Sequence, residues 1–408
     1  MQLKRVVITG YGAVSPYGRG VGSMMDGLYA CTSAVRQVND LAQIQGMRPR
    51  VAALVSGIDP KEIPRKYRRS MSSMSIYATL ACQDALAQAE ITPSEEDGAL
   101  GICFGSTVGS TQATEAFFKD YFRDHSLERM KSTVFFQIMN HSCAANVAQA
   151  LDITGRIMAP AAACSTGCQA VGYGYEQVAL GKQTMLLCGG ADEFHPLTAA
   201  TFDVMHAASC AFNDQPHATP RPFDRRRDGM VCAEGAGALL LESLESAEAR
   251  GATIIAEICG FATLSDPSNI ANPNSSAMER CMREALKDAQ LSASDISYVN
   301  AHATATSQGD IAESAAIHNI FGSQTPVSSL KGHMGHTMAA SGALELIASL
   351  EMLRRKELVP TLNLEEVDPD CSPLQHLLSV TPCAVDAIMK NNFALGGVNS
   401  SLVVRSAS

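Results

Sequence analysis

One cysteine of the chain, Cys164, lies in a context suited to nucleophilic chemistry. It stands in AAACSTGCQA, where residues 157–163 predict a strand and residues 165–180 predict a helix rich in small side chains. A thiol at the start of a helix meets the positive end of the helix dipole and free backbone N–H groups, which favour the thiolate. The same N–H groups can face a developing oxyanion. We interpret the other cysteines as small buried residues, because even Cys168, one turn later, lacks a comparable setting.

Two histidines and a lysine follow predicted strands in the second part of the chain. His302 begins HATATS after the apolar run at 296–301, and His336 lies in KGHMGHTMAASG, five residues after Lys331. Neutral imidazoles can donate hydrogen bonds to a thioester oxygen and stabilise the enolate left when CO2 departs. A nearby lysine can orient a histidine and set its protonation. The spacing of His333 and His336 is only a weak metal signal without supporting carboxylates or thiolates, so we expect no metal.

Other polar residues have two interpretations each. Glu313 is either a first-turn helix carboxylate favoured by the dipole or a buried partner for Lys331. Thr304 and Thr306 are either ordinary loop residues or hydroxyls that line a channel for a polar arm. A basic run is either a solvated helix start or a docking patch for an acidic partner; it comprises Arg65, Lys66, Arg68 and Arg69.

Composition limits the class of protein. The 408 residues are 46% hydrophobic and 18% charged, which is typical of a globular chain with more than one hydrophobic core. The net charge of −10 disfavours nucleic acid as a partner. The N-terminus does not resemble a signal peptide, and no apolar run is long enough to span a membrane. We therefore interpret the 13 scattered cysteines as reduced thiols and expect a cytoplasmic protein.

An internal repeat predicts the architecture. ALAQAEITPS at 85–94 and ALKDAQLSAS at 285–294 each end an amphipathic helix and lead to a short apolar strand and a small, polar loop. Further along, strands are expected at 184–190 and 391–397. Alternating strands and helices imply mostly parallel sheets with helices on their faces. We expect an α/β protein of two similar, tightly packed halves, residues 1–250 with the nucleophile and residues 251–408 with the histidines and lysine.

These motifs together resemble the Cys-His-His ketosynthases of type II fatty acid and polyketide synthesis. The resemblance rests on ACSTG, the His302 loop, the Lys331 to His336 segment, RPFDRRRDGMVCAEGAGALLLE at 221–242 and NNFALGGVNSSLVV near the end. It covers essentially the whole chain and is nearest to bacterial β-ketoacyl synthase I. It implies a thiolase-like, duplicated five-layer αβαβα fold, and a homodimer or a heterodimer with a chain-length-factor-like homologue.

The resemblance also implies a role for each matching residue. Cys164 takes an acyl group from acyl carrier protein, and malonyl carrier protein then enters. His302 and His336 assist decarboxylation, and Lys331 and Glu313 match a supporting pair. Backbone N–H groups of Cys164 and Leu395 match a second oxyanion site. The phosphopantetheine arm belongs to the carrier, so no other cofactor is expected. The implied substrate-binding residues are Thr304, Thr306, Phe393, Leu395, Val108 and Phe202, and the implied carrier-docking residues are Lys66, Arg69 and Lys131.

The chain departs from the family pattern around the pocket. Leu395 replaces the usual gating phenylalanine, Ala394 replaces the glycine before it, and Val398 replaces a threonine. The usual His-Gly-Thr-Gly-Thr loop reads HATAT, and the methyl groups of Ala303 and Ala394 should restrict the backbone. Gly155-Arg156 replaces a Gly-Pro pair. Because these changes spare the catalytic groups, they favour a specialised ketosynthase, such as one of an aryl-polyene or other polyketide pathway, over a housekeeping fatty acid synthase.

Three other interpretations are weaker. A non-catalytic chain-length subunit would lack the nucleophile that Cys164 supplies. A thiolase would carry a second catalytic cysteine near the C-terminus, where this chain has NNFALGGVN, with Cys383 eight residues before Asn391. An initiating ketosynthase would have asparagine where this chain has His336.

Overall fold

The two halves of the chain form sheets with the same strand order. A computed structural model describes residues 3–407. In the N-terminal half the order is β6-β5-β7-β8-β1, and in the C-terminal half it is β11-β10-β15-β16-β9. The N-terminal strands are β1 (Val6–Ser15), β5 (Leu100–Gly105), β6 (Ile157–Met158), β7 (Met185–Asp192) and β8 (Gly235–Ser243). The C-terminal strands are β9 (Ala256–Ser265), β10 (Tyr298–Asn300), β11 (Pro326–Ser328), β15 (Ala387–Ala394) and β16 (Val398–Ser406).

Strand directions also match between the halves, but the sheets are mixed rather than mostly parallel. In each half the outer pairings are parallel and the two nearest the junction are antiparallel. The reason is clearest in the second half, where a short turn through Leu395 joins β15 to β16, and so short a connection permits only antiparallel pairing. The sheets meet where Val6–Ile8 of β1 pairs with residues 256–258 of β9.

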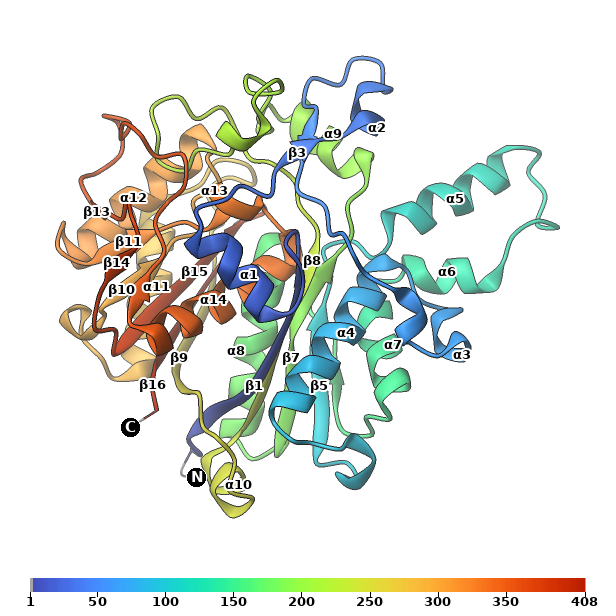
Figure 1. Ribbon diagram of the computed structural model, residues 1–408, viewed down its shortest axis with the longest axis horizontal. Coiled ribbons are helices and arrows are strands. Elements are labelled where there is room, and N and C mark those ends of the chain that lie inside the picture. The colour runs from blue at the N-terminus through green and yellow to red at the C-terminus, as the bar shows by residue number, and fades with distance from the viewer. Residues whose placement is uncertain (1–2, 408) are drawn as a thin grey trace.

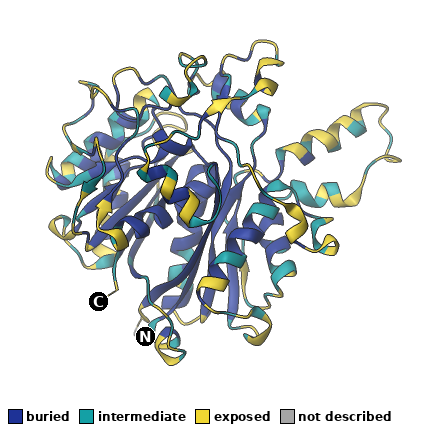
Figure 2. Ribbon diagram, viewed as in Figure 1, coloured by how far each residue is buried: buried dark blue, intermediate teal, exposed yellow. Residues whose placement is uncertain are grey.

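Helices complete five layers, as the thiolase-like expectation required. Helices α8 (Thr166–Ala179) and α14 (Ser341–Arg355) lie between the two sheets (Figure 1). Helices α4 (Ser73–Gln88) and α7 (Ser142–Leu151) cover the outer face of the first sheet. Helices α11 (Ser275–Ala289) and α12 (Ser307–Phe321) cover that of the second. The sheets and the central helices are almost wholly buried (Figure 2), which explains apolar strands without polar alternation.

The central helices approach each other closely at their N-terminal ends. A Cβ atom on Gly342 of α14 would lie 2.3 Å from the backbone nitrogen of Cys168 in α8. Only glycine permits this approach. The contact brings the start of α8, and with it Cys164, against the second half of the chain.

One segment extends away from the layers. Helices α5 (Thr111–Phe122) and α6 (Ser132–Ile138) form a protruding arm at the right of Figure 1. Its exposed apolar side chains include Phe118, Phe122, Leu127 and Phe135. Among residues 3–407, no helix combines the length and apolarity needed to cross a membrane.

Candidate active site

The nucleophile candidate lies in a tight turn before α8. The preceding strand is shorter than predicted, because β6 ends at Met158 and Pro160 cannot donate a ladder hydrogen bond. Cys164 instead belongs to a 3-10 turn (Ala163–Ser165) that leads directly into α8. Ala163 has a φ of 47°, a left-handed conformation that is uncommon for alanine. This turn presents the Cys164 side chain toward the second half of the chain.

The backbone of His302 is fixed by a buried carboxylate. His302 lies two residues after β10, and its backbone N–H donates to Glu313 of α12 over 2.7 Å. The N–H of Ala303 donates to the other oxygen of Glu313 over 2.6 Å. Burial raises the pKa of Glu313 to about 7, while these two N–H groups oppose the rise.

The backbone of His336 is fixed by a hydrogen bond, while its ring nitrogens remain free to contact a substrate. Its N–H donates to the carbonyl of Val231, and it follows Gly335, whose φ of 69° favours glycine. Both ring nitrogens of His336 are buried without a hydrogen-bond partner among residues 3–407. His333 instead contacts the carbonyl of Pro360 through Nε2 at 2.9 Å, so the two histidines do not form a pair.

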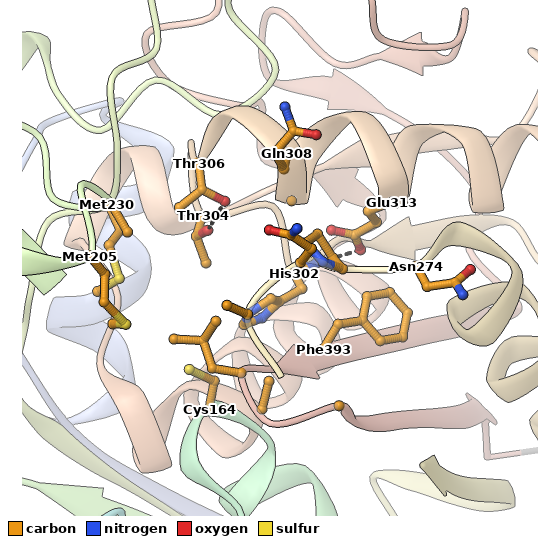
Figure 3. Close-up of a pocket in the computed structure, with 18 of the residues that line it drawn as sticks. Cys164, Met205, Met230, Asn274, His302, Thr304, Thr306, Gln308, Glu313 and Phe393 are labelled. Atoms are coloured by element: carbon orange, nitrogen blue, oxygen red, sulfur yellow. Dashed lines mark hydrogen bonds between the residues drawn. The ribbon is translucent and has the colours of Figure 1, made fainter. Parts of the chain in front are cut away.

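Cys164, His302 and His336 converge on one point. The thiol and one ring nitrogen from each histidine all lie within 4.8 Å of one another. The two rings are nearly perpendicular, with centroids 5.3 Å apart. Figure 3 shows Cys164 and His302 facing the same cavity. The two imidazoles therefore lie beside the position that a thioester on Cys164 would occupy. Their N–H groups can donate hydrogen bonds to an oxygen held there.

Both imidazoles are neutral at physiological pH. Burial, and then the nearby Lys331 charge, hold the pKa of His302 and of His336 well below the usual range. Each neutral ring carries one N–H that can donate to a substrate oxygen.

The resting thiol differs from the sequence expectation. Burial raises the pKa of Cys164 to about 12, although Lys331 and the residue's own backbone N–H oppose the rise. Desolvation thus outweighs the helix terminus, and the resting site holds a thiol rather than a thiolate. Its proton must leave as the sulfur attacks.

Of the two interpretations of Glu313, the one that pairs it with Lys331 is contradicted by the structure. The Nζ of Lys331 donates to Glu345 of α14 over 2.6 Å, not to Glu313, whose oxygens accept the two backbone N–H groups. Lys331 and Glu345 are both fully buried. The signal that sequence analysis missed is Glu345, one of two carboxylates in the otherwise apolar and buried helix segment at 341–352.

Asn392 is a second residue that sequence analysis missed. Its side-chain nitrogen donates to the carbonyl of Cys164 over 3.0 Å and lies 3.4 Å from Nδ1 of His302. The Cys164 carbonyl can only accept, so the NH2 group of the Asn392 amide must point toward Cys164 and His302. Nδ1 of His302 must then accept the hydrogen bond from that NH2 group. The proton of neutral His302 therefore lies on Nε2. The signal was available, since the ending NNFALGGVN resembles a ketosynthase ending Asn-Ser-Phe-Gly-Phe-Gly-Gly-Thr-Asn, in which serine stands where this chain has Asn392.

Comparison with known proteins identifies the family. Residues 3–247 match the model of the β-ketoacyl synthase N-terminal domain, and residues 255–365 match that of the β-ketoacyl synthase C-terminal domain. The chain belongs to the β-ketoacyl synthase family. It is therefore an acyltransferase of the ketosynthase type.

Similar ketosynthases come from several sources. The chain is 35% identical over 407 residues to 3-oxoacyl-[acyl-carrier-protein] synthase 1 of Escherichia coli, covering 99% of each protein. A β-ketoacyl synthase from Burkholderia phymatum is 44% identical, with a TM-score of 0.96 and coverage of 99% of this chain and all of that one. The ishigamide ketosynthase/chain length factor is 29% identical, with a TM-score of 0.92 and full coverage of both chains.

The cavity of this ketosynthase contains most of the expected substrate-binding residues. It has a volume of about 470 Å³ and opens above Cys164 (Figure 3). Thr304 and Thr306 lie on its wall with their hydroxyls 3.1 Å apart. Phe202, Phe393 and Leu395 also line it, and Leu395 is 41% exposed. The single chain does not place Val108 there, because Val108 lies 53% exposed beyond the end of β5.

The backbone strain of the HATAT loop falls at a different alanine from the one expected. Ala303 and Ala394 do not have a positive φ, whereas Ala305 has a φ of 69°. This conformation costs an alanine about 1 kcal/mol relative to glycine. The N–H of Ala305 donates to buried Asp310 over 3.1 Å, which holds the loop in place.

The basic run is exposed and available to a partner. Arg65, Lys66 and Arg69 are exposed around the short helix α3 (Arg65–Arg68), and none forms an ion pair within residues 3–407. Arg68 instead donates to the carbonyl of Ile63. Lys131 is also exposed, at the start of α6 on the arm.

Proposed function

We propose that this ketosynthase joins an acyl group on Cys164 to a malonyl unit carried by acyl carrier protein, in chain elongation by a type II system. The supporting observation is the convergence of one thiol and two neutral imidazoles within 4.8 Å. In this division, residues 1–250 supply the nucleophile and residues 251–408 supply the histidines and Lys331.

The reaction has three steps. Cys164 Sγ attacks the acyl thioester, and the carrier's phosphopantetheine thiol leaves with the proton. Malonyl carrier protein then loses CO2, and the electron pair of the broken C–C bond forms an enolate whose oxygen accepts hydrogen bonds from His302 and His336. The enolate carbon attacks the acyl-Cys164 carbonyl, the Cys164 sulfur leaves as a thiolate, and a proton taken up from solvent restores the resting thiol. The backbone N–H groups of Cys164 and Leu395 are proposed to hold the oxyanion of the acyl-transfer steps.

Intact mass spectrometry tests this scheme. The protein is mixed with acyl carrier protein bearing a short acyl group, and malonyl carrier protein is then added. An acyl adduct on Cys164 followed by β-ketoacyl carrier protein is expected. If no adduct forms with any primer or candidate partner subunit, the mechanism is wrong.

We further propose a specialised polyketide pathway, such as aryl-polyene synthesis, in preference to housekeeping fatty acid elongation. Leu395 at the cavity wall supports this, because a leucine lacks the flat aromatic face of the family's usual gate. Similarity to a putative polyketide β-ketoacyl synthase 1 of Streptomyces cyaneus agrees with it, whereas similarity to synthase 1 of E. coli favours the housekeeping alternative.

Replacing Leu395 by phenylalanine should change primer selection. We expect the preference between saturated and polyunsaturated acyl carriers to change by about tenfold, the size typical of a reshaped apolar pocket. Competition assays with both carriers measure this, with Leu378→Phe as a control because Leu378 is exposed outside the cavity. A wild-type preference for long saturated chains would contradict the specialised pathway.

Reversing the docking charges should weaken the use of carrier protein. The double variant Lys66→Glu, Arg69→Glu is expected to raise the KM for acyl carrier protein by about tenfold, because it replaces attraction by repulsion toward an acidic partner. The exposed Lys182→Glu variant is the matched control. Equal KM values for both variants, or no change in salt dependence, would place the docking surface elsewhere. Lys131→Glu, measured separately, tests the third proposed docking residue.

A dimer accounts for the exposed apolar surface. Val108, Ile157 of edge strand β6, and the arm present apolar side chains that a second ketosynthase subunit would cover. The partner is either an identical chain or a chain-length-factor-like homologue, and light scattering of the purified protein distinguishes these.

All 13 cysteines are free thiols, which agrees with a cytoplasmic location.

A further inference from the structure

A second buried lysine contacts the carboxylate that pairs with Lys331. Lys390 of β15 is fully buried, and its Nζ lies 2.7 Å from the Oε2 of Glu345. Lys331 contacts the other oxygen, Oε1, at 2.6 Å. The Nζ of Lys390 also donates to the carbonyl of Asn391, two residues before Phe393 of the cavity wall. Two lysines therefore share one carboxylate, and the formal charge of the cluster is +1.

This charge lies beside the two imidazoles. His302 and His336 are both close enough to Lys331 and Lys390 for each lysine to disfavour imidazolium formation. Burial prevents water from screening these charges. The other titratable groups around the imidazoles and the lysine cluster are Cys164 before α8, Cys168 in α8, Asp192 in β7, Cys232 before β8, Asp310 and Glu313 in α12, and Glu345 in α14. The carboxylate of Glu345 alone would neutralise Lys331, so the second lysine decides the sign of the cluster.

We propose that Lys390 is a positioning residue of the condensation site, which shares Glu345 with Lys331 and thereby leaves one uncompensated positive charge beside His302 and His336. The charge keeps both imidazoles neutral and able to donate to the enolate oxygen at lower pH than Lys331 and Glu345 alone would permit. This inference rests on the proposed roles of His302 and His336 in decarboxylation.

A lysine that acts by charge gives a different pH dependence from one that only fills space. Lys390→Met keeps the length of the side chain and removes the charge, and Lys390→Gln adds a neutral donor that can reach the carbonyl of Asn391. In both variants Glu345 still pairs with Lys331, so no unpaired carboxylate is left in the core. Removing a positive charge raises the pKa of each imidazole. As the pH falls, the variants should therefore lose activity at a higher pH than the wild type does.

The test measures CO2 release from malonyl carrier protein across pH, with thermal melting of each variant. We expect both variants to be within about threefold of wild type near pH 7.5 and to lose activity about one pH unit above wild type on acidification, which is about a tenfold lower rate where both profiles fall with pH. Lys287→Met, which removes an exposed lysine paired with Glu284, should follow the wild-type profile.

Two results would overturn the proposal. A variant-to-wild-type ratio that does not depend on pH would show a structural role only. Recovery of the wild-type profile by Lys390→Gln but not Lys390→Met would assign the effect to the Asn391 hydrogen bond. Failure of the underlying mechanism is separate, because His302→Ala and His336→Ala would then retain CO2 release whatever the Lys390 variants do.

Discussion

Replacing Cys164 by alanine should lower β-ketoacyl product formation by at least about 10⁴-fold, as expected when a nucleophile that forms a covalent intermediate is removed. Cys164 is the cysteine that the structure groups with His302 and His336. Cys168 is fully buried one turn later, in the close contact between α8 and α14. The measurement is single-turnover formation of β-ketoacyl carrier protein, with intact mass to detect the acyl-enzyme.

The matched control for this loss is Cys168→Ala. It removes a buried thiol from the helix that follows the Cys164 turn, so it should retain the acyl adduct and most of the activity. CO2 release from malonyl carrier protein should continue in Cys164→Ala, because both histidines remain. Product formation by Cys164→Ala near the wild-type rate would eliminate the covalent mechanism.

Replacing either His302 or His336 by alanine should slow CO2 release by about 10²–10³-fold, the usual effect of removing one donor to a developing oxyanion. The two effects should be of similar size, because Asn392 contacts only Nδ1 of His302 and leaves its Nε2–H free, and both ring nitrogens of His336 lack protein partners among residues 3–407. Formation of the acyl adduct on Cys164 should fall much less in both variants. Rates of CO2 release and of adduct formation, measured on the same preparations, check this separation.

His333→Gln is the control for the histidine variants. His333 is buried three residues before His336, but it bonds the carbonyl of Pro360 and lies outside the group of three. A glutamine can preserve that donor, so CO2 release should remain near wild type. Equal losses in adduct formation and CO2 release for His336→Ala would indicate a general disturbance of the site rather than a role in decarboxylation.

The sequence alone was sufficient for the family and for three residues that the structure brings together, Cys164, His302 and His336. The repeated segments at 85–94 and 285–294 predicted the duplicated halves, because each marks the same helix, turn and strand. Local motifs located Cys164, His302 and His336, since each follows a strand near small residues. The thiolase-like layers followed from the resemblance and agree with the matching strand orders.

Only the tertiary structure decided how these groups are charged and paired. The sequence favoured a thiolate at Cys164 and left Glu313 as one possible partner for Lys331, because it shows helix ends and spacing but not desolvation or distance. In the folded chain, burial raises the pKa of the thiol, Glu313 binds backbone N–H groups, and Lys331 contacts Glu345. Lys390 joins that cluster from β15, a strand close to the end of the chain. Pairing between distant segments and exclusion of water are properties of packing, so local sequence patterns could not supply them.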